Sequence, residues 1–438
     1  MEEIGDMTVE VLHLKTKSLI IAALIGSLGG LIFGYDLGAL SASTQSLRGH
    51  FCLSPAAFGL TISSSLWGTI CGSLLAGWLG DRVRRRDLIL ASSALYAFAA
   101  IGTTLAGQSG WILLISMRFL CGMAIGGFTV GCPLYLSELA PVALRGRLVC
   151  LFQVQVGVGV VVAFSLGSLF AHVTASGVMW KFCLGVGAIP ALLLLVLQRP
   201  MPKMEAKFSG NESVEKTHLG GKLFVLEATS AHESLFCRKN LRPILLASSI
   251  AIFNQLSGVN VLLLYLLDIL ASAGIGLSLG HTYTVLISWL SLATTLLGMA
   301  FVDKLGRKLL LFLGSAGMAL CLLGLGVAIP HHFAPVFYLL ILVGYNAFFA
   351  FSQGTVVWVY LSELFPPGIR GAGQGYGSSV HWIANAILIS IFPLMQLASS
   401  LRIFYFFALM MVLQIGVIWL WYPETQGTAL GSVVTAGS

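Results

Sequence analysis

The sequence predicts an all-α membrane protein in which twelve transmembrane helices form two pseudo-symmetric halves of six. Three observations lead to this fold class. The chain of 438 residues is 57% hydrophobic and only 9% charged, with a mean hydropathy of +0.92, whereas soluble domains carry about 25% charged residues. Apolar runs of about 20 residues recur, each long enough to cross a ~30 Å hydrocarbon core as a helix. Motifs of the first half return in the second half.

The first six expected spans follow one another from Lys17 to Gln198, and basic turns separate the second from the third and the fourth from the fifth. They lie at 18–40, 56–79, 88–106, 111–137, 148–171 and 178–197. Continuous apolar runs of this length distinguish them from the strands of a transmembrane barrel, which are alternating segments of ~10 residues. We therefore expect residues 1–197 to form the N-terminal half.

The last six expected spans begin after Arg242, and the run VDKLGRK at 302–308 separates the second of them from the third. They lie at 243–270, 282–302, 309–329, 334–362, 376–397 and 402–422. Residues 243–438 are thus the expected C-terminal half. The segment 198–242 has little hydrophobic continuity and is expected to be a cytoplasmic linker.

Basic residues predict the orientation of the chain. Only four of the 24 Lys and Arg residues fall outside the segments expected to be cytoplasmic, namely Arg48, Arg118, Lys181 and Arg402. The positive-inside rule then places both termini in the cytoplasm, and it explains the net charge of +7 without a nucleic-acid partner. The acidic start, Met1 to Glu10, is unlike a cleavable signal peptide. Compact loops favour the cytoplasmic membrane of a bacterium over a eukaryotic membrane.

An internal repeat relates the two halves at a shift of about 225 positions. LSELAPVALRG at 136–146 returns as LSELFPPGIRG at 361–371, and GDRVRRR at 80–86 returns as VDKLGRK at 302–308. Two six-helix repeats related by an axis along the membrane normal form a transporter architecture, with the substrate site between them near the midplane.

These motifs carry a family resemblance over nearly the whole chain. The sequence resembles the sugar porters of the major facilitator superfamily in FGYD (33–36), GDRVRRR, MRFLCGMAIGG (117–127), QLSGVN (255–260), WVYLSELFPPGIRG (358–371) and YPETQG (422–427). The resemblance implies the major facilitator fold and transport of a sugar by alternating access. It departs from the family pattern at Arg84, Asn254, Ser291 and His381 and in GTVVW before Trp358, so the identity of the sugar stays open.

Asp36 is a carboxylate inside an apolar span. A lipid-facing charge there costs ~2.5–3.5 kcal/mol, so such groups face the bundle interior and find a partner. If the first helix ends near residue 40 and the fourth begins near Trp111, Asp36 and Arg118 lie at similar depths and can pair. In related sugar porters an aspartate at this position accompanies proton symport. The alternatives are proton coupling by Asp36 and Arg118 or a permanent structural ion pair.

A neutral, hydroxyl-rich ligand needs uncharged donors and acceptors beside apolar ring faces. The resemblance carries the sugar site to Phe33, Gln153, Asn254, Gln255, Asn260, Tyr265, Ser291, Trp358, His381, Trp382 and Asn385. Gln255 and Asn260 share a helix face only if the helix is distorted, which Ser257 and Gly258 permit. Interhelical hydrogen bonds or packing are the alternative roles for these amides and aromatic residues.

Carboxylates and arginines recur at symmetric positions on the expected cytoplasmic side. We expect them to clamp the inner ends of the halves together, and the set is Arg82, Glu138, Arg145, Arg307, Glu363 and Arg370. The alternative is that the arginines serve only to set the topology.

The sequence therefore predicts a secondary transporter that moves a monosaccharide, a hexose or a pentose, with a proton. A proton-independent uniporter is the nearest alternative, and a non-transporting sugar sensor is a further one. No enzymatic triad, nucleotide loop or metal-ligand cluster is evident in the sequence, so we expect no enzyme activity, no cofactor and no metal. The eight cysteines lack paired spacing and are interpreted as packing residues. We expect the protein to function as a monomer in the lipid bilayer.

Overall fold

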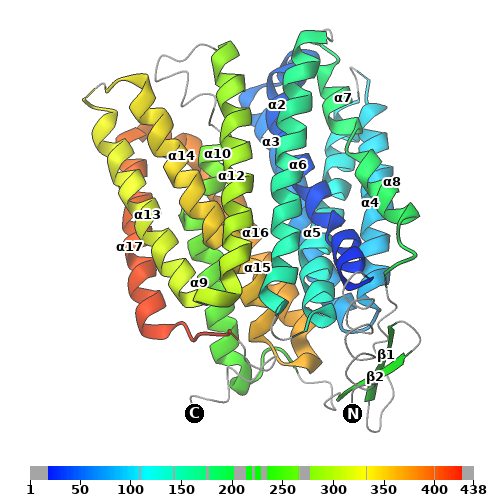
Figure 1. The fold of residues 1–438 in the computed structure, drawn as a ribbon. Coiled ribbons are helices and arrows are strands. Elements are labelled where there is room, and N and C mark those ends of the chain that lie inside the picture. The colour runs from blue at the N-terminus through cyan, green and yellow to red at the C-terminus, as the bar shows by residue number, and fades with distance from the viewer. Residues whose placement is uncertain are drawn as a thin grey trace, which may run out of the picture.

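A computed structural model describes residues 18–107, 110–141, 144–173, 177–201, 214–219, 222–227, 234–264, 266, 277–331, 333–398 and 400–426. Helices from both halves of the sequence stand side by side and run along a common direction (Figure 1). Within the described residues, eleven helices are long and apolar enough to cross a membrane. Large side chains such as Trp67, Leu74 and Leu420 are exposed on the bundle, as expected where lipid is the solvent.

The N-terminal half contains the helices that precede the linker. Helical residues 18–26 lead through Ser27 into the first long helix, which continues to Phe51 and is longer than the expected span 18–40. The helices are α2 (Leu28–Phe51), α3 (Pro55–Gly80), α4 (Arg85–Thr104), α5 (Trp111–Leu139), α6 (Arg145–Val173), α7 (Met179–Gly185) and α8 (Ala188–Val196).

The C-terminal half follows the same plan with more interruptions. Its elements are η2 (Arg238–Asn240), α9 (Leu241–Leu256), α10 (Val259–Leu264), α12 (Leu277–Leu305), α13 (Arg307–Ala328), α14 (Pro335–Phe351), α15 (Gln353–Leu364), η3 (Pro367–Ile369), α16 (Arg370–Ala398) and α17 (Ser400–Trp421). The helix α16 contains the expected span 376–397 and has 29 residues. Ser378, Ser379 and His381 are buried within it.

Three of the expected spans are each divided into two helices. The sixth divides into α7 and α8 at 186–187, the seventh into α9 and α10 at 257–258, and the tenth into α14 and α15 at Ser352. Gly258 has a φ of 85°, a left-handed conformation that glycine adopts without a steric penalty. This turn lets the helix continue in a new register.

The two halves touch mainly through two helix pairs, α3 with α16 and α6 with α12. Gly77 and Gly375 let the backbones of α3 and α16 meet, because a Cβ on either would collide with the other chain segment. We call the end of the bundle that carries the α3–α4 and α12–α13 turns the inner end, since the basic residues predict that it faces the cytoplasm.

The linker contains the two described strands, β1 (Val214–Leu219) and β2 (Lys222–Glu227), which pair antiparallel with Val214 opposite Glu227. They lie beyond the helical bundle at one of its ends (Figure 1). The bundle itself is helical, as predicted, and the hairpin is a local addition to an all-α fold.

Candidate functional site

Asp36 on α2 and Arg118 on α5 form a bidentate ion pair inside the N-terminal half. Arg118 Nη1 donates to Asp36 Oδ1 at 2.6 Å and Nη2 donates to Oδ2 at 2.7 Å. Asp36 is 3% exposed and Arg118 1%, so water does not screen the pair. The prediction that these two residues pair rested on the assumption that the first helix ends near residue 40. That assumption was wrong, since Asp36 lies fifteen residues before Phe51.

Tyr96 on α4 completes the charged cluster, and the sequence reasoning missed it. Its hydroxyl donates to Asp36 Oδ1 at 2.9 Å, and its side chain is 1% exposed. The break between α7 and α8 makes room for it, because a Cβ on Gly187 would stand 2.8 Å from the Tyr96 oxygen. A mid-span tyrosine carries a polar atom that needs a partner when buried, but nothing in its spacing points to Asp36.

A cavity between the two halves is lined by α2 and α6 on one side and by α9, α10, α12, α14, α15 and α16 on the other. Its volume of about 120 Å³ is several times the ~10–15 Å³ that one water needs by a comparable measure, so it can hold a small ligand. Its lining includes no Asp, Glu, Lys or Arg among the described residues. The site therefore suits an uncharged molecule.

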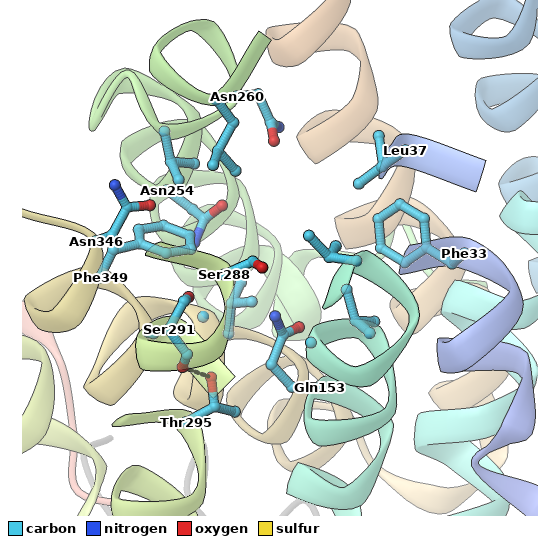
Figure 2. A pocket seen from close by; sticks show the side chains of 18 of the residues that line it. Phe33, Leu37, Gln153, Asn254, Asn260, Ser288, Ser291, Thr295, Asn346 and Phe349 are labelled. Carbon is cyan, nitrogen blue, oxygen red and sulfur yellow. Dashed lines mark hydrogen bonds between the residues drawn. The ribbon is translucent and has the colours of Figure 1, made fainter. Parts of the chain in front are cut away.

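The cavity is asymmetric in polarity. From the N-terminal half, Gln153 is the one amide, among apolar residues such as Phe33, Leu37 and Val156. The C-terminal half supplies nearly all the other polar groups (Figure 2). A ligand with one apolar and one hydroxyl-bearing face would match this division.

An amide chain crosses the C-terminal wall at the α9–α10 break. Asn260 Nδ2 donates to Gln255 Oε1 at 2.9 Å, so the break does bring these two residues together. Gln255 Nε2 in turn donates to Asn254 Oδ1 at 3.1 Å and to His381 Nε2 at 2.8 Å. Because Gln255 donates, that ring nitrogen of His381 accepts and the facing nitrogen carries no proton. Asn254 Nδ2 is buried without a partner among the described residues, which leaves it free to donate to a ligand.

Aromatic side chains join the halves across the cavity. Trp358 Nε1 donates to Gln153 Oε1 at 3.2 Å, and the rings of Phe33 and Trp382 meet edge-on with centroids 5.4 Å apart. The Trp358 ring also lies 5.2 Å from that of His381. These rings provide apolar faces beside the amide chain.

Nine residues expected to bind the sugar line this cavity: Phe33, Gln153, Asn254, Gln255, Asn260, Ser291, Trp358, His381 and Trp382. Asn385 was also expected to bind the sugar, but it is buried one turn beyond His381 and is not part of the lining. Tyr265 lies outside the described residues. Sequence reasoning missed other lining residues, since no motif marked them; those on α12 and α14 include Thr284, Ser288, Thr295, Asn346 and Phe349.

Two carboxylates hold the halves together at the inner end. Asp81, at the end of α3, accepts from the backbone N–H groups of Gly371 and Ala372 at 2.8 Å each. Asp303, near the end of α12, accepts from the backbone N–H of Arg147 at 2.9 Å. Each acid thus caps a helix of the opposite half, where free N–H groups and the helix dipole favour negative charge.

Burial raises the pKa of the Asp81 carboxyl above its ordinary value, although the positive charge of Arg85 and the two backbone donors act to lower it. The carboxylate lies between two apolar halves, and this loss of water is the largest influence on its proton affinity.

The glutamates and arginines expected to form a clamp lie beside one another, with one change of partner. Arg307 Nη2 donates to Glu363 at 2.8 Å, and Thr425 donates to the same carboxylate at 2.6 Å. Arg145 of the other half interacts electrostatically with Glu363. Glu363 therefore connects both halves with the segment that follows α17.

Arg85, rather than the expected Arg82, lies beside Glu138, with Nε donating to Oε1 at 3.1 Å. Arg370 of the C-terminal half approaches the same oxygen at 3.8 Å. Arg82 instead donates to Trp78 O and lies over the Trp78 ring. The reason is that the turn occupies residues 81–84 and α4 begins at Arg85, so Arg85 is the first arginine on the helix face toward α5.

Comparison with known proteins agrees with this architecture. The family model described as "Sugar (and other) transporter" matches residues 22–435. The chain is 31% identical to the glucose transporter GlcP of Staphylococcus epidermidis, with 94% of this chain and 95% of that protein covered. It is 28% identical to the D-xylose-proton symporter of Escherichia coli, with 93% of each covered.

The structure of the proton:xylose symporter XylE bound to 6-bromo-6-deoxy-D-glucose is similar to this one, with a TM-score of 0.82 and 24% identity. The match covers 97% of this chain and 100% of that one. This likeness confirms the predicted fold of twelve transmembrane helices.

Proposed function

The chain belongs to the sugar porter family of the major facilitator superfamily, and from this premise we propose that it carries a monosaccharide together with a proton across the membrane by alternating access. The observation that carries the proposal is the buried pair of Asp36 and Arg118. A protonatable acid held inside the bundle beside an uncharged cavity is what a proton-coupled carrier of a neutral ligand requires.

The ion pair can exist in two states because protonation removes the negative charge of Asp36. An isolated buried charge costs several kcal/mol, so each of the two charged groups is stabilised by the other while they remain in contact. When a proton reaches Asp36, the bidentate attraction is lost and α2 is released from α5. Return of the proton restores the contact, which gives the two positions that a coupled cycle needs.

The pair communicates with the cavity through α2. Phe33 lies three residues before Asp36 on the same helix, so about one turn separates them. Its ring contacts Trp382 of the C-terminal half at 5.4 Å. A shift of α2 on protonation therefore moves a residue that lines the cavity and touches the opposite half.

The energy available is sufficient for accumulation. One charge moving through 100 mV is worth ~2.3 kcal/mol, and one pH unit adds about 1.4 kcal/mol. Together they exceed the ~1.4 kcal/mol that a tenfold gradient of a neutral solute requires.

The closed inner end fits one state of the cycle. The caps by Asp81 and Asp303 and the clamps at Glu138 and Glu363 join the halves below the cavity. We propose that these contacts separate when the sugar leaves toward the cytoplasm, in a cytoplasmic membrane with both termini inside.

The test is sugar uptake by purified protein in proteoliposomes that contain a trapped pH dye. Wild-type protein should concentrate the sugar when the outside is acidic, and sugar influx should acidify the lumen. The variant Asp36→Asn should exchange sugar across the membrane but should not accumulate it. Asp87→Asn is the matched control, because Asp87 is exposed and pairs with Arg84 at the start of α4.

Each alternative function has its own result. Downhill transport that ignores the pH gradient in wild-type protein would establish a uniporter and refute the coupling role of Asp36. Binding of sugar without any flux would establish a sensor. Accumulation that persists in Asp36→Asn would refute the coupling role while leaving the sugar carrier in place.

A further inference from the structure

One wall of the cavity carries four small polar side chains that no sequence motif explained as a group. Ser288, Ser291 and Thr295 come from α12 and Asn346 comes from α14. We call these four residues the acceptor wall. Figure 2 shows Ser291, Thr295 and Asn346 on the side of the cavity away from Phe33 and Leu37.

Three of the four side chains donate a hydrogen bond to a backbone carbonyl of their own helix. Ser288 Oγ donates to Val285 O at 2.7 Å, and Thr295 Oγ1 donates to Ser291 O at 2.8 Å. Asn346 Nδ2 donates to Leu342 O at 2.9 Å. A hydroxyl used in this way keeps only its oxygen lone pairs for a ligand, whereas the amide of Asn346 keeps its oxygen lone pairs and one N–H. The wall therefore presents mainly acceptors.

The wall is protected from bulk water. Ser288, Thr295 and Asn346 are 6%, 3% and 5% exposed. The amide orientation of Asn346 follows from its bond to Leu342, which turns Oδ1 toward the cavity (Figure 2). Buried acceptors are costly when left without a donor, so this wall selects for a ligand that brings one.

A neutral hydroxyl is the donor that fits. An ammonium group would also donate, but it needs a counter-charge when buried, and the described lining contains no carboxylate. The opposite side of the cavity offers the aromatic faces of Trp358 and Phe33 and the amide of Gln153. A sugar ring placed there would present its substituents to the acceptor wall.

We propose that the acceptor wall binds the hydroxyl of the exocyclic hydroxymethyl group of a hexopyranose, and that the protein therefore prefers hexoses to pentoses. The inference rests on the proposed function as a monosaccharide carrier. A pentopyranose of the same ring configuration lacks this group and leaves the acceptors of the wall without a donor from the sugar. One such hydrogen bond changes affinity by about tenfold.

The experiment compares matched sugars in proteoliposome counterflow at equal pH on both sides. Each hexose is paired with the pentose that lacks only the hydroxymethyl group: D-glucose with D-xylose, D-galactose with L-arabinose and D-mannose with D-lyxose. The 6-deoxy derivative of the active hexose removes the hydroxyl alone. We expect the pentose and the 6-deoxy sugar to compete about tenfold more weakly than the hexose.

Two substitutions in the acceptor wall test whether it causes the preference for hexoses over pentoses. Thr295→Val and Asn346→Leu should each reduce the hexose preference to threefold or less while leaving competition by the pentose within twofold of wild type. Thr294→Val is the matched control, because Thr294 donates to its own helix in the same way but does not line the cavity. It should retain the full preference.

The outcomes separate the two proposals. Equal competition by hexose, pentose and 6-deoxy sugar in wild-type protein would overturn the inference, and this measurement needs no variant. Equal losses for hexose and pentose in the wall variants would overturn it as well. Absence of counterflow with every sugar of the three pairs would instead refute the proposed function.

Discussion

Removal of Asp81 should open the inner end of the protein. The Asp81 carboxylate accepts from two backbone N–H groups at the start of α16, those of Gly371 and Ala372, both at 2.8 Å. These contacts cross from one half to the other, so they exist only while the inner end is closed. Asp81→Ala deletes both acceptors and leaves the backbone of each half intact.

The magnitude follows from the two bonds. A hydrogen bond to a charged group contributes about 1.5–3 kcal/mol. The Asp81 side chain is 23% exposed, so water replaces part of each bond and the lower value applies. Two bonds then amount to about 3 kcal/mol, which corresponds to roughly a 100-fold rise in the population that is open at the inner end.

Thiol accessibility measures this population. Ser378 is 0% exposed and lies between Ser73 and Thr129 where α16 meets α3 and α5. The reporter Ser378→Cys, in a Cys237→Ser background, should react slowly with a membrane-impermeant maleimide applied to inside-out vesicles. Adding Asp81→Ala should accelerate the labelling between tenfold and 100-fold.

The control for this prediction is Asp87→Ala. Asp87 pairs with Arg84 near the start of α4, and both side chains are more than 40% exposed, so among the described residues this acid has its ion pair within its own half. If Asp81→Ala accelerates labelling no more than Asp87→Ala does, the carboxylate cap does not hold the inner end closed and the reasoning fails.

Three further perturbations follow from the same structure. Arg85→Ala should slow counterflow several-fold, whereas Arg82→Ala should stay near wild type, because Arg85 is the arginine that contacts the clamp glutamate; the reverse order would refute the assignment. Tyr96→Phe removes a donor from a buried carboxylate at a cost of about 1.5–3 kcal/mol and should lower the midpoint of thermal unfolding by several degrees, and an unchanged midpoint would contradict this. Gly34→Ala should greatly reduce the yield of folded protein in size-exclusion chromatography, since a Cβ there collides with the backbone of α6, while Gly416→Ala, with open space around it, should not.

The sequence was most informative about features that depend on composition along the chain. The order of the spans, the repeat and the basic turns all follow from local patterns, and the fold they predicted is confirmed by the likeness to a solved transporter. The pairing of Asp36 with Arg118 could be predicted from the sequence because charges inside a membrane are few and each must find a partner. The end of the first helix was placed too early, since the chain turns polar from Ser41 onward while the helix continues to Phe51.

The candidate site was predicted only in part, because only some of its residues lie in recognisable motifs. Residues that lie in recognisable motifs, such as Gln255, Asn260 and Trp358, were identified and line the cavity. Of the acceptor wall only Ser291 was expected. Ser288, Thr295 and Asn346 were not, because small polar residues are common in apolar helices and their exposure to a cavity depends on the rotation of α12 and α14. Successive side chains turn by about 100° around a helix, so a shift of one position moves a side chain from the cavity to the lipid.

By itself the sequence determined that this chain crosses a membrane twelve times in two related halves and that the first half contains a charged pair, because hydropathy and charge are local properties of a sequence. Only the tertiary structure decided that Tyr96 joins the pair, that Arg85 takes the place beside Glu138 and that the four residues of the acceptor wall line the cavity. Those outcomes depend on where helices begin, break and turn against one another, and close packing between helices sets these features over the whole bundle.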